Sequence, residues 1–102
     1  MRLFDSHCHL DEEAFATDVA EVVDRALESG LVGLATIGIT ADTSRAAVAL
    51  AERFQHVHAV VGIQPNYVSE STDADWDTIL ELVASPQVVA VGETGLDRYW
   101  DY

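Results

Sequence analysis

The chain has 102 residues, of which 49% are hydrophobic, so it can form one small domain with an apolar core. Eighteen Asp and Glu against five Arg and no Lys give a net charge of −13, and such a surface repels a phosphate backbone unless bound metal ions attract it locally. The single cysteine excludes an internal disulfide, and the lack of a signal-peptide pattern or a membrane-spanning apolar run leads us to expect a soluble cytoplasmic protein.

Strand-like and helix-like segments alternate along the chain. In order, they are a strand at 2–6, a helix at 17–30, a strand at 32–37, a helix at 43–54, a strand at 57–62, a helix at 73–85 and a strand at 87–93. Short, continuously apolar strands are typical of a parallel sheet that is covered on both faces. The spacing of about 30 residues per unit therefore predicts a single domain over 1–102, built from parallel β/α units.

Polar residues and glycine mark the expected helix ends. Thr17 or Asp18 can cap the first helix, and Gly30 suits its C-terminal stop. Thr40 or Asp42 can cap the second helix. The apolar stripe of the third helix consists of Trp76, Ile79, Leu80 and Val83.

Two α/β architectures fit this order, an open doubly wound sheet and an arc of a β/α barrel. No GxGxxG or GxxxxGK loop follows the first strand, which disfavours a nucleotide-binding version of the fold. In both architectures ligands bind at the carboxyl ends of the strands. His7 and His9 follow the first strand, Gln64 and Asn66 follow the third, and Glu93 follows the fourth.

The chain contains two His-x-His pairs, and only one lies at the expected binding edge. His56 and His58 begin a strand, so we interpret them as structural or exposed. In extended backbone His7 and His9 point to the same side and can bind one divalent metal, although two ordinary loop histidines would look the same. Asp5 can orient an imidazole or bind directly. Cys8 is expected to point into the packing, although a thiolate ligand or nucleophile is an alternative.

Glu93 directly follows an all-apolar strand, where a carboxylate serving only solubility is not expected. It can cap a helix, pair with Arg98, or bridge two metals through its two oxygens. Asp97 and Arg98 can position the loop, and Arg98 can also contact a phosphate. Three aromatic residues are expected to pack against whatever follows them, with base stacking as the less favoured alternative: Tyr99, Trp100 and Tyr102.

The motifs "DSHCHL" and "VGETGLD", with "GIQPN" between them, resemble the N-terminal part of the TatD family of metal-dependent hydrolases, from Arg2 to Tyr102. The resemblance implies a TIM barrel in which His7 and His9 bind one metal and Glu93, as the catalytic carboxylate, bridges two. It also implies hydrolysis of phosphodiester bonds, typically in DNA, by metal-activated water. The metals would be divalent ions from the set Zn, Mn, Ni, Fe and Mg.

The chain departs from the family pattern in two ways. The family usually has histidines in the stretch after the third strand, where this chain has Gln64 and Asn66. This difference is expected to affect the substrate preference or the rate of the reaction. A complete barrel also runs to about 250 residues. We therefore expect the first half of a barrel, lacking two further histidines and an aspartate of the family, as a fragment or a self-associating half-barrel.

Two other classes of function are considered. An amidohydrolase or PHP-type phosphoesterase also begins with His-x-His after its first strand, but "GETGLD" argues against both. A non-catalytic half-barrel that self-associates or binds a partner protein would show little hydrolysis.

Overall fold

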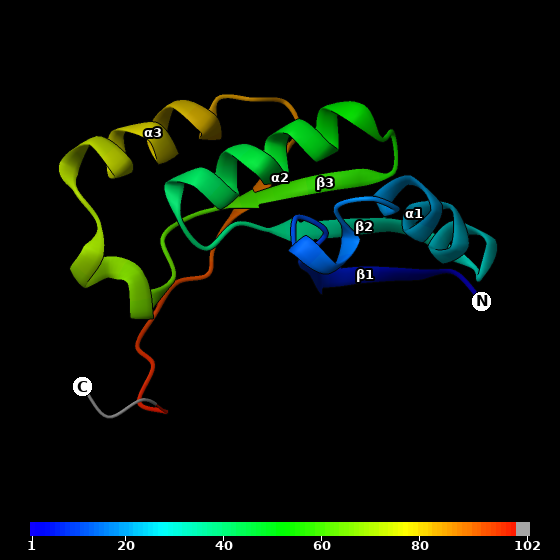
Figure 1. Cartoon of the computed structure of the whole chain (residues 1–102), viewed down its shortest axis with the longest axis horizontal. Coiled ribbons are helices and arrows are strands. Elements are labelled where there is room, and N and C mark those ends of the chain that lie inside the picture. The colour runs from blue at the N-terminus through cyan, green and yellow to red at the C-terminus, as the bar shows by residue number, and fades with distance from the viewer. Residues whose placement is uncertain (100–102) are drawn as a thin grey trace.

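The computed structural model describes residues 1–99, so the expectations for Trp100 and Tyr102 lie outside the described residues. Strands and helices alternate as predicted (Figure 1). The strands are β1 (Leu3–Cys8), β2 (Leu31–Ile37), β3 (Val57–Val61) and β4 (Val88–Val91). The helices are α1 (Val19–Glu28), α2 (Ala41–Arg53) and α3 (Asp73–Val83), with short 3-10 helices η1 (Glu13–Phe15) and η2 (Pro65–Glu70).

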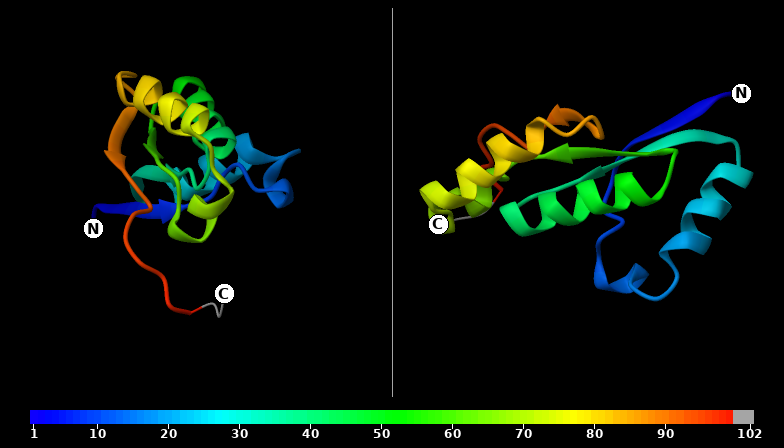
Figure 2. Two further views of the ribbon diagram at one scale, coloured as in Figure 1. Left: turned by 90° about the vertical axis from the view of Figure 1, so that its left-hand side faces the viewer. Right: turned by 90° about the horizontal axis from the view of Figure 1, so that it is seen from above.

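The strands form one parallel sheet in the order β1-β2-β3-β4, with β1 and β4 at its edges. A doubly wound sheet reverses its strand order at a switch point, whereas a barrel adds each strand beside the previous one. The observed order is therefore that of a barrel arc, and Figure 2 shows the sheet curving between its two edges. The predicted parallel β/α units are confirmed, and the open doubly wound alternative is wrong.

The main core lies between the sheet and the helices. Its fully or nearly buried residues are Leu10, Val19, Val23, Leu34, Ala47, Val48, Ala51, Val57, Ala59, Val61 and Ile79. A second, smaller cluster consists of Ala35, Ile37 and Val60. β2 alternates between these two clusters and is buried from Gly33 to Ile37, as its continuously apolar sequence predicted.

The helix caps are partly as expected. Thr40 caps α2, because its hydroxyl accepts the Thr43 backbone N–H and the Thr43 hydroxyl accepts the Thr40 N–H in return. Helix α2 therefore begins two residues before the predicted start, and Asp42 lies inside it. Asp18 occupies the cap position of α1 without a side-chain cap bond. Gly30 follows that helix with a φ of +107°, which glycine tolerates because it has no Cβ.

Only Ile79 of the predicted α3 stripe is fully buried. Trp76, Leu80 and Val83 are 47%, 54% and 42% exposed, so the stripe as a whole is not a core face. The reason is geometric: within residues 1–99, α3 contacts α2, β3 and β4, and it reaches the core through Ile79 and the partly buried Leu82.

The longest helix in residues 1–99 has 13 residues. A bilayer-spanning helix needs about 20 apolar residues, so none of the described helices meets that requirement.

Replacement of Ile79 is expected to destabilise the fold far more than replacement of its neighbour Leu80. Ile79→Ala removes a fully buried side chain and should lower the free energy of unfolding by about 2–5 kcal/mol, and the milder Ile79→Val by about 0.5–1.5 kcal/mol. Leu80→Ala, on the same helix but half exposed, should change it by about 0.5 kcal/mol or less. Urea denaturation followed by circular dichroism measures all three. Equal losses for Ile79→Ala and Leu80→Ala would contradict this packing.

Candidate metal centre

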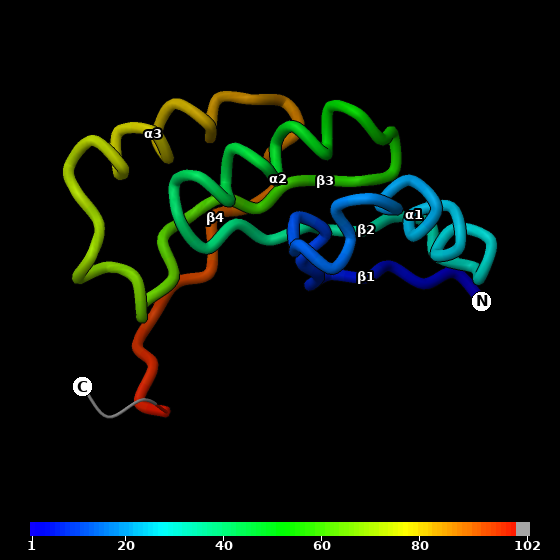
Figure 3. Tube along the Cα trace, viewed as in Figure 1, coloured from blue at the N-terminus to red at the C-terminus, as the bar shows by residue number. Residues whose placement is uncertain are grey.

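The carboxyl ends of the parallel strands lie at one end of the sheet, toward the left in Figure 3. There the structure brings together His7 on β1, His9 just after it and Glu93 just after β4. Strand β1 runs to Cys8, two residues beyond the predicted end, so His7 lies within the strand. The Nε2 atoms of His7 and His9 are 3.6 and 4.0 Å from Oε2 of Glu93. One ligand atom from each residue lies within 4.8 Å of the other two.

A backbone carbonyl orients His9. Its Nδ1 is 3.0 Å from the carbonyl oxygen of Ile37, at the end of β2. Because a carbonyl only accepts hydrogen bonds, this contact requires the proton on Nδ1 and leaves the lone pair on Nε2, the atom that faces Glu93. No sequence pattern indicates Ile37 in this role, because any residue supplies a carbonyl and strand pairing selects which one.

The two imidazoles contact each other edge to face, with ring centroids 5.1 Å apart and an angle of 81° between the rings. The side chain of His7 is 53% exposed and that of His9 is 30% exposed. The Asp5 carboxylate accepts the His7 backbone N–H at 3.1 Å, so its recorded contact holds the strand rather than an imidazole. His9 is thus the more firmly held of the two.

Glu93 is placed by a close backbone approach between β3 and β4. A Cβ on Gly62 would collide with the carbonyl of Gly92, and the Gly92 N–H donates to the Val61 carbonyl at 3.0 Å. The buried Ser44 hydroxyl holds Gly62 from α2, accepting its N–H at 3.1 Å and donating to its carbonyl at 3.2 Å. The residue before Glu93 therefore sits directly against β3, with no side chain between the two backbones.

The amide residues after β3 connect two loops of this edge. The Gln64 side-chain oxygen accepts the Asn66 backbone N–H, and the Asn66 side-chain amide donates to Oδ2 of Asp97, both at 2.8 Å. The Tyr99 N–H donates to Oδ1 of Asp97 at 2.8 Å. That backbone bond, followed by the bond from Asn66, lowers the pKa of the Asp97 carboxyl below its ordinary value. Asn66 and Asp97 thereby join the loop after β3 to the segment that follows Glu93.

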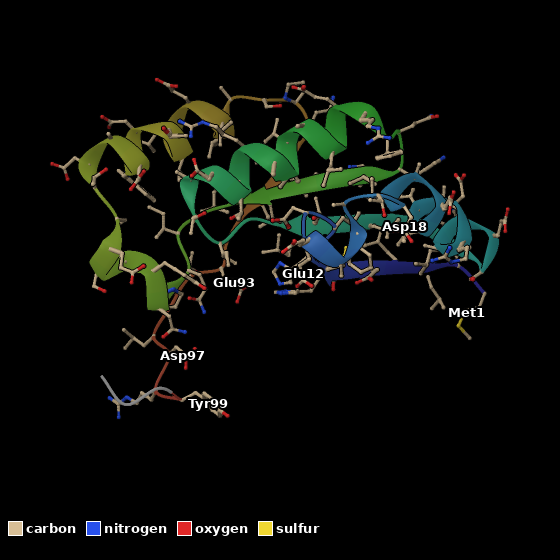
Figure 4. The ribbon with its side chains drawn as sticks, viewed as in Figure 1. Met1, Glu12, Asp18, Glu93, Asp97 and Tyr99 are labelled. Atoms are coloured by element: carbon tan, nitrogen blue, oxygen red, sulfur yellow. The ribbon has the colours of Figure 1, made fainter. Side chains whose placement is uncertain are left out.

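A cavity of about 630 Å³ opens beside the three candidate ligands. His9 and Glu93 line it together with Gln64, Asn66 and further residues from both ends of η2. Figure 4 shows Glu12 and Glu93 on the same rim. Three acidic residues also line the cavity: Asp11 and Glu12 between β1 and η1, and Glu70 at the end of η2. The sequence motifs did not identify them, because none of them directly follows a strand.

The remaining candidates lie elsewhere. His56 and His58 are not part of any metal-suitable group found in residues 1–99, and the His58 ring packs against Phe4 with centroids 5.8 Å apart. Arg98 lines a second cavity, and no ion pair between it and Glu93 is present in the described residues.

Cys8 points into the packing, as the alternation predicted. Its thiol donates to the Ala35 carbonyl at 3.3 Å and packs beside the main core. Burial, followed by the charges of Asp5 and Asp11, raises the pKa of Cys8 to about 11. The metal-suitable group does not include it, so the geometry disfavours the thiolate alternative.

Comparison with known proteins gives one consistent family. The model of the family described as TatD related DNase matches residues 4–102. A Bacillus subtilis protein named uncharacterized metal-dependent hydrolase YabD is 36% identical over 99 residues, covering 97% of this chain and 39% of that protein. The Salmonella typhimurium protein named 3'-5' ssDNA/RNA exonuclease TatD is 37% identical over 95 residues, covering 93% of this chain and 36% of that protein.

A solved structure agrees. The crystal structure of YjjV, a TatD homologue from Escherichia coli, superposes with a TM-score of 0.89 at 30% identity and covers 97% of this chain and 39% of that one. The β/α units thus match those of a TatD-type TIM barrel, and the chain spans about two fifths of the length of the curated relatives it matches.

Cys8 is expected to react slowly with iodoacetamide in the folded, metal-free chain. With its pKa raised to about 11, the thiolate fraction at pH 8 is about 100-fold below that of an ordinary thiol, and the rate should keep rising about tenfold per pH unit until pH 10. Mass spectrometry of timed samples in EDTA measures the rate of Cys8 alkylation, and the urea-unfolded chain serves as the control. Equal rates for folded and unfolded chain at pH 8 would show that the thiol is neither buried nor shifted.

Proposed function

Because this chain belongs to the TatD related DNase family, we propose that it serves metal-dependent hydrolysis of phosphodiester bonds in single-stranded DNA or RNA, with His7, His9 and Glu93 as metal ligands. The observation that carries the proposal is the convergence of these three donors at the carboxyl edge of the sheet. The names of the relatives support the hydrolase class and the nucleic-acid substrate.

The donors fit a divalent ion. Two ligand atoms that each lie about 2.1 Å from one ion are at most about 4.2 Å apart. Both histidine-to-glutamate separations, 3.6 and 4.0 Å, are below this limit. Three protein ligands also leave a coordination position open, which is the arrangement of catalytic rather than structural sites. The two imidazoles favour a transition metal over Mg²⁺.

The bound metal would supply Lewis-acid activation of water and neutralise charge on the phosphate. The protein residues hold and orient the ligands. The Ile37 carbonyl holds the His9 ring with its Nε2 toward the site, and the backbone packing of Gly92 holds Glu93. Both histidine contacts of Glu93 use Oε2, so its other carboxylate oxygen is available, and Glu93 would also be the residue to help hold a second divalent ion.

We assign the side-chain amides of Gln64 and Asn66, at the rim of the cavity, to contacts with the substrate. Gln64 and Asn66 line the cavity and replace the histidines usual in the family. The Gln64 oxygen is engaged by the Asn66 backbone, which leaves its NH₂ group as a neutral donor for a phosphate oxygen. A neutral donor lacks the charge of an imidazolium, so in an acidic chain attraction of the substrate depends chiefly on the metal.

Metal binding tests the ligand assignment. Isothermal titration with Zn²⁺ or Mn²⁺ should show His9→Ala and Glu93→Gln binding about 100-fold more weakly than the unchanged chain, because each loses a direct ligand. His58→Ala, the same residue type in the look-alike pair at the opposite end of the sheet, should bind normally. Normal binding by His9→Ala, or weakened binding by His58→Ala, would refute the assignment.

Activity tests the substrate class. Single-stranded oligonucleotides, cyclic amides and small phosphate monoesters are offered to the chain with Mn²⁺ and again with EDTA. We expect any cleavage to be confined to the oligonucleotide, to be lost with EDTA and to fall at least about 100-fold in Glu93→Gln. Hydrolysis of the amide would favour the amidohydrolase alternative. Metal binding without any hydrolysis, together with a dimer on size exclusion, would favour the self-associating half-barrel.

A further inference from the structure

We propose that the cavity on the far side of Asn66 is a second subsite, which binds the nucleotide next to the scissile phosphate through Arg98. This inference rests on the proposed function, since it requires the scissile phosphate to lie beside His9 and Glu93. The ligand class is an unpaired nucleotide within a strand: one phosphate, and a base with an exposed face.

The second cavity adjoins the first. Its volume is about 450 Å³, and Asn66 lines both cavities. At this shared boundary the Asn66 amide donates to Asp97, which lines the second cavity. Figure 4 shows Asp97 and Tyr99 on the segment that leaves the sheet beyond Glu93. A strand that crosses this boundary would therefore pass from the candidate metal centre directly to Arg98.

Arg98 is the cation available at this edge. Arg45 donates to Asp42 and Thr78, and Arg53 stacks on a phenylalanine ring. Arg2 precedes β1 and Arg25 lies in the last turn of α1, both at the opposite end of the strands. Among residues 1–99 Arg98 forms no ion pair. In a chain of net charge −13, a single unpaired guanidinium beside a cavity is well suited to one phosphate.

Apolar side chains flank this arginine. Leu96 is 92% exposed and Val68 is 54% exposed, and both line the cavity. Tyr99, next to Arg98 in the sequence, is 83% exposed. Apolar surface beside one cation matches a nucleotide whose base is unstacked. A duplex keeps its base faces covered and presents two charged backbones, which a single arginine would hold poorly against the acidic surface.

The test compares a ligand that reaches the second cavity with one that does not. The probes are a fluorescein-labelled phosphorothioate thymidine tetranucleotide, which resists cleavage, and thymidine 5'-monophosphate as its competitor, both with Mn²⁺. Arg98→Gln should weaken tetranucleotide binding about tenfold and reduce the slope of log affinity against log salt by about 0.7, because one phosphate contact is lost. Mononucleotide binding should not change, since it needs only the metal cavity.

Further variants separate charge from apolar contact and from folding. Arg98→Lys should restore the salt slope, because it keeps the charge. Leu96→Ser should weaken the tetranucleotide several-fold with an unchanged slope. Arg45→Gln, which removes an arginine already paired with Asp42, should leave both measurements unaltered. Circular dichroism confirms that each variant is folded.

Two outcomes would overturn the subsite. One is an unchanged affinity and salt slope in Arg98→Gln, and the other is an equal loss of tetranucleotide and mononucleotide. Mn²⁺ titration of the same samples distinguishes the two proposals. A chain that binds Mn²⁺ and mononucleotide but gains nothing from the longer strand contradicts the subsite alone, whereas a chain that binds no Mn²⁺ contradicts the proposed function, and the subsite falls with it.

Discussion

The candidate site depends on the close approach of the β3 and β4 backbones at Gly62 and Gly92. A side chain at Gly62 would collide with the Gly92 carbonyl, and the strands would have to separate there. The buried Ser44 of α2 holds Gly62 in place through hydrogen bonds to its N–H and its carbonyl. Because Glu93 follows Gly92 directly, this contact determines whether its carboxylate meets the histidines of β1. The position of Glu93 at this edge of the sheet thus depends on a contact between two backbones with no side chain between them.

Because the chain is strongly acidic, the geometry of this edge matters for substrate binding. An acidic surface does not attract a polyanion, so binding of a nucleic acid must come from local features. The structure offers two, a His₂Glu group that fits a divalent ion and a single arginine beside the neighbouring cavity. Asn66 and Asp97 connect the loops that carry them. Metal and arginine would then hold successive phosphates, with neutral amides between them.

Much of the fold could be predicted from local pattern. Apolar runs predicted the strands, and Thr40 was one of the two predicted caps of α2, because hydroxyl capping depends only on residues close in sequence. The first His-x-His lies at the carboxyl end of a strand and the second at the beginning of one, and this difference separated the pair near Glu93 from the pair far from it. The apolar stripe of α3 was visible in the sequence, but only Ile79 of it is fully buried, because periodicity reports an apolar face and not which neighbours cover it.

The sequence by itself determined the parallel β/α order and the edge at which the polar residues gather, because both follow from strand polarity and residue type, which are local properties. The choice of His7, His9 and Glu93 as candidate ligands followed from the resemblance of their motifs to those of the TatD family. Only the tertiary structure decided that the Ile37 carbonyl orients His9, that Asn66 bonds to Asp97, and that Arg98 faces a cavity of its own rather than Glu93. Those contacts join residues far apart in the chain, and their partners are selected by sheet register and backbone packing, which no local pattern records.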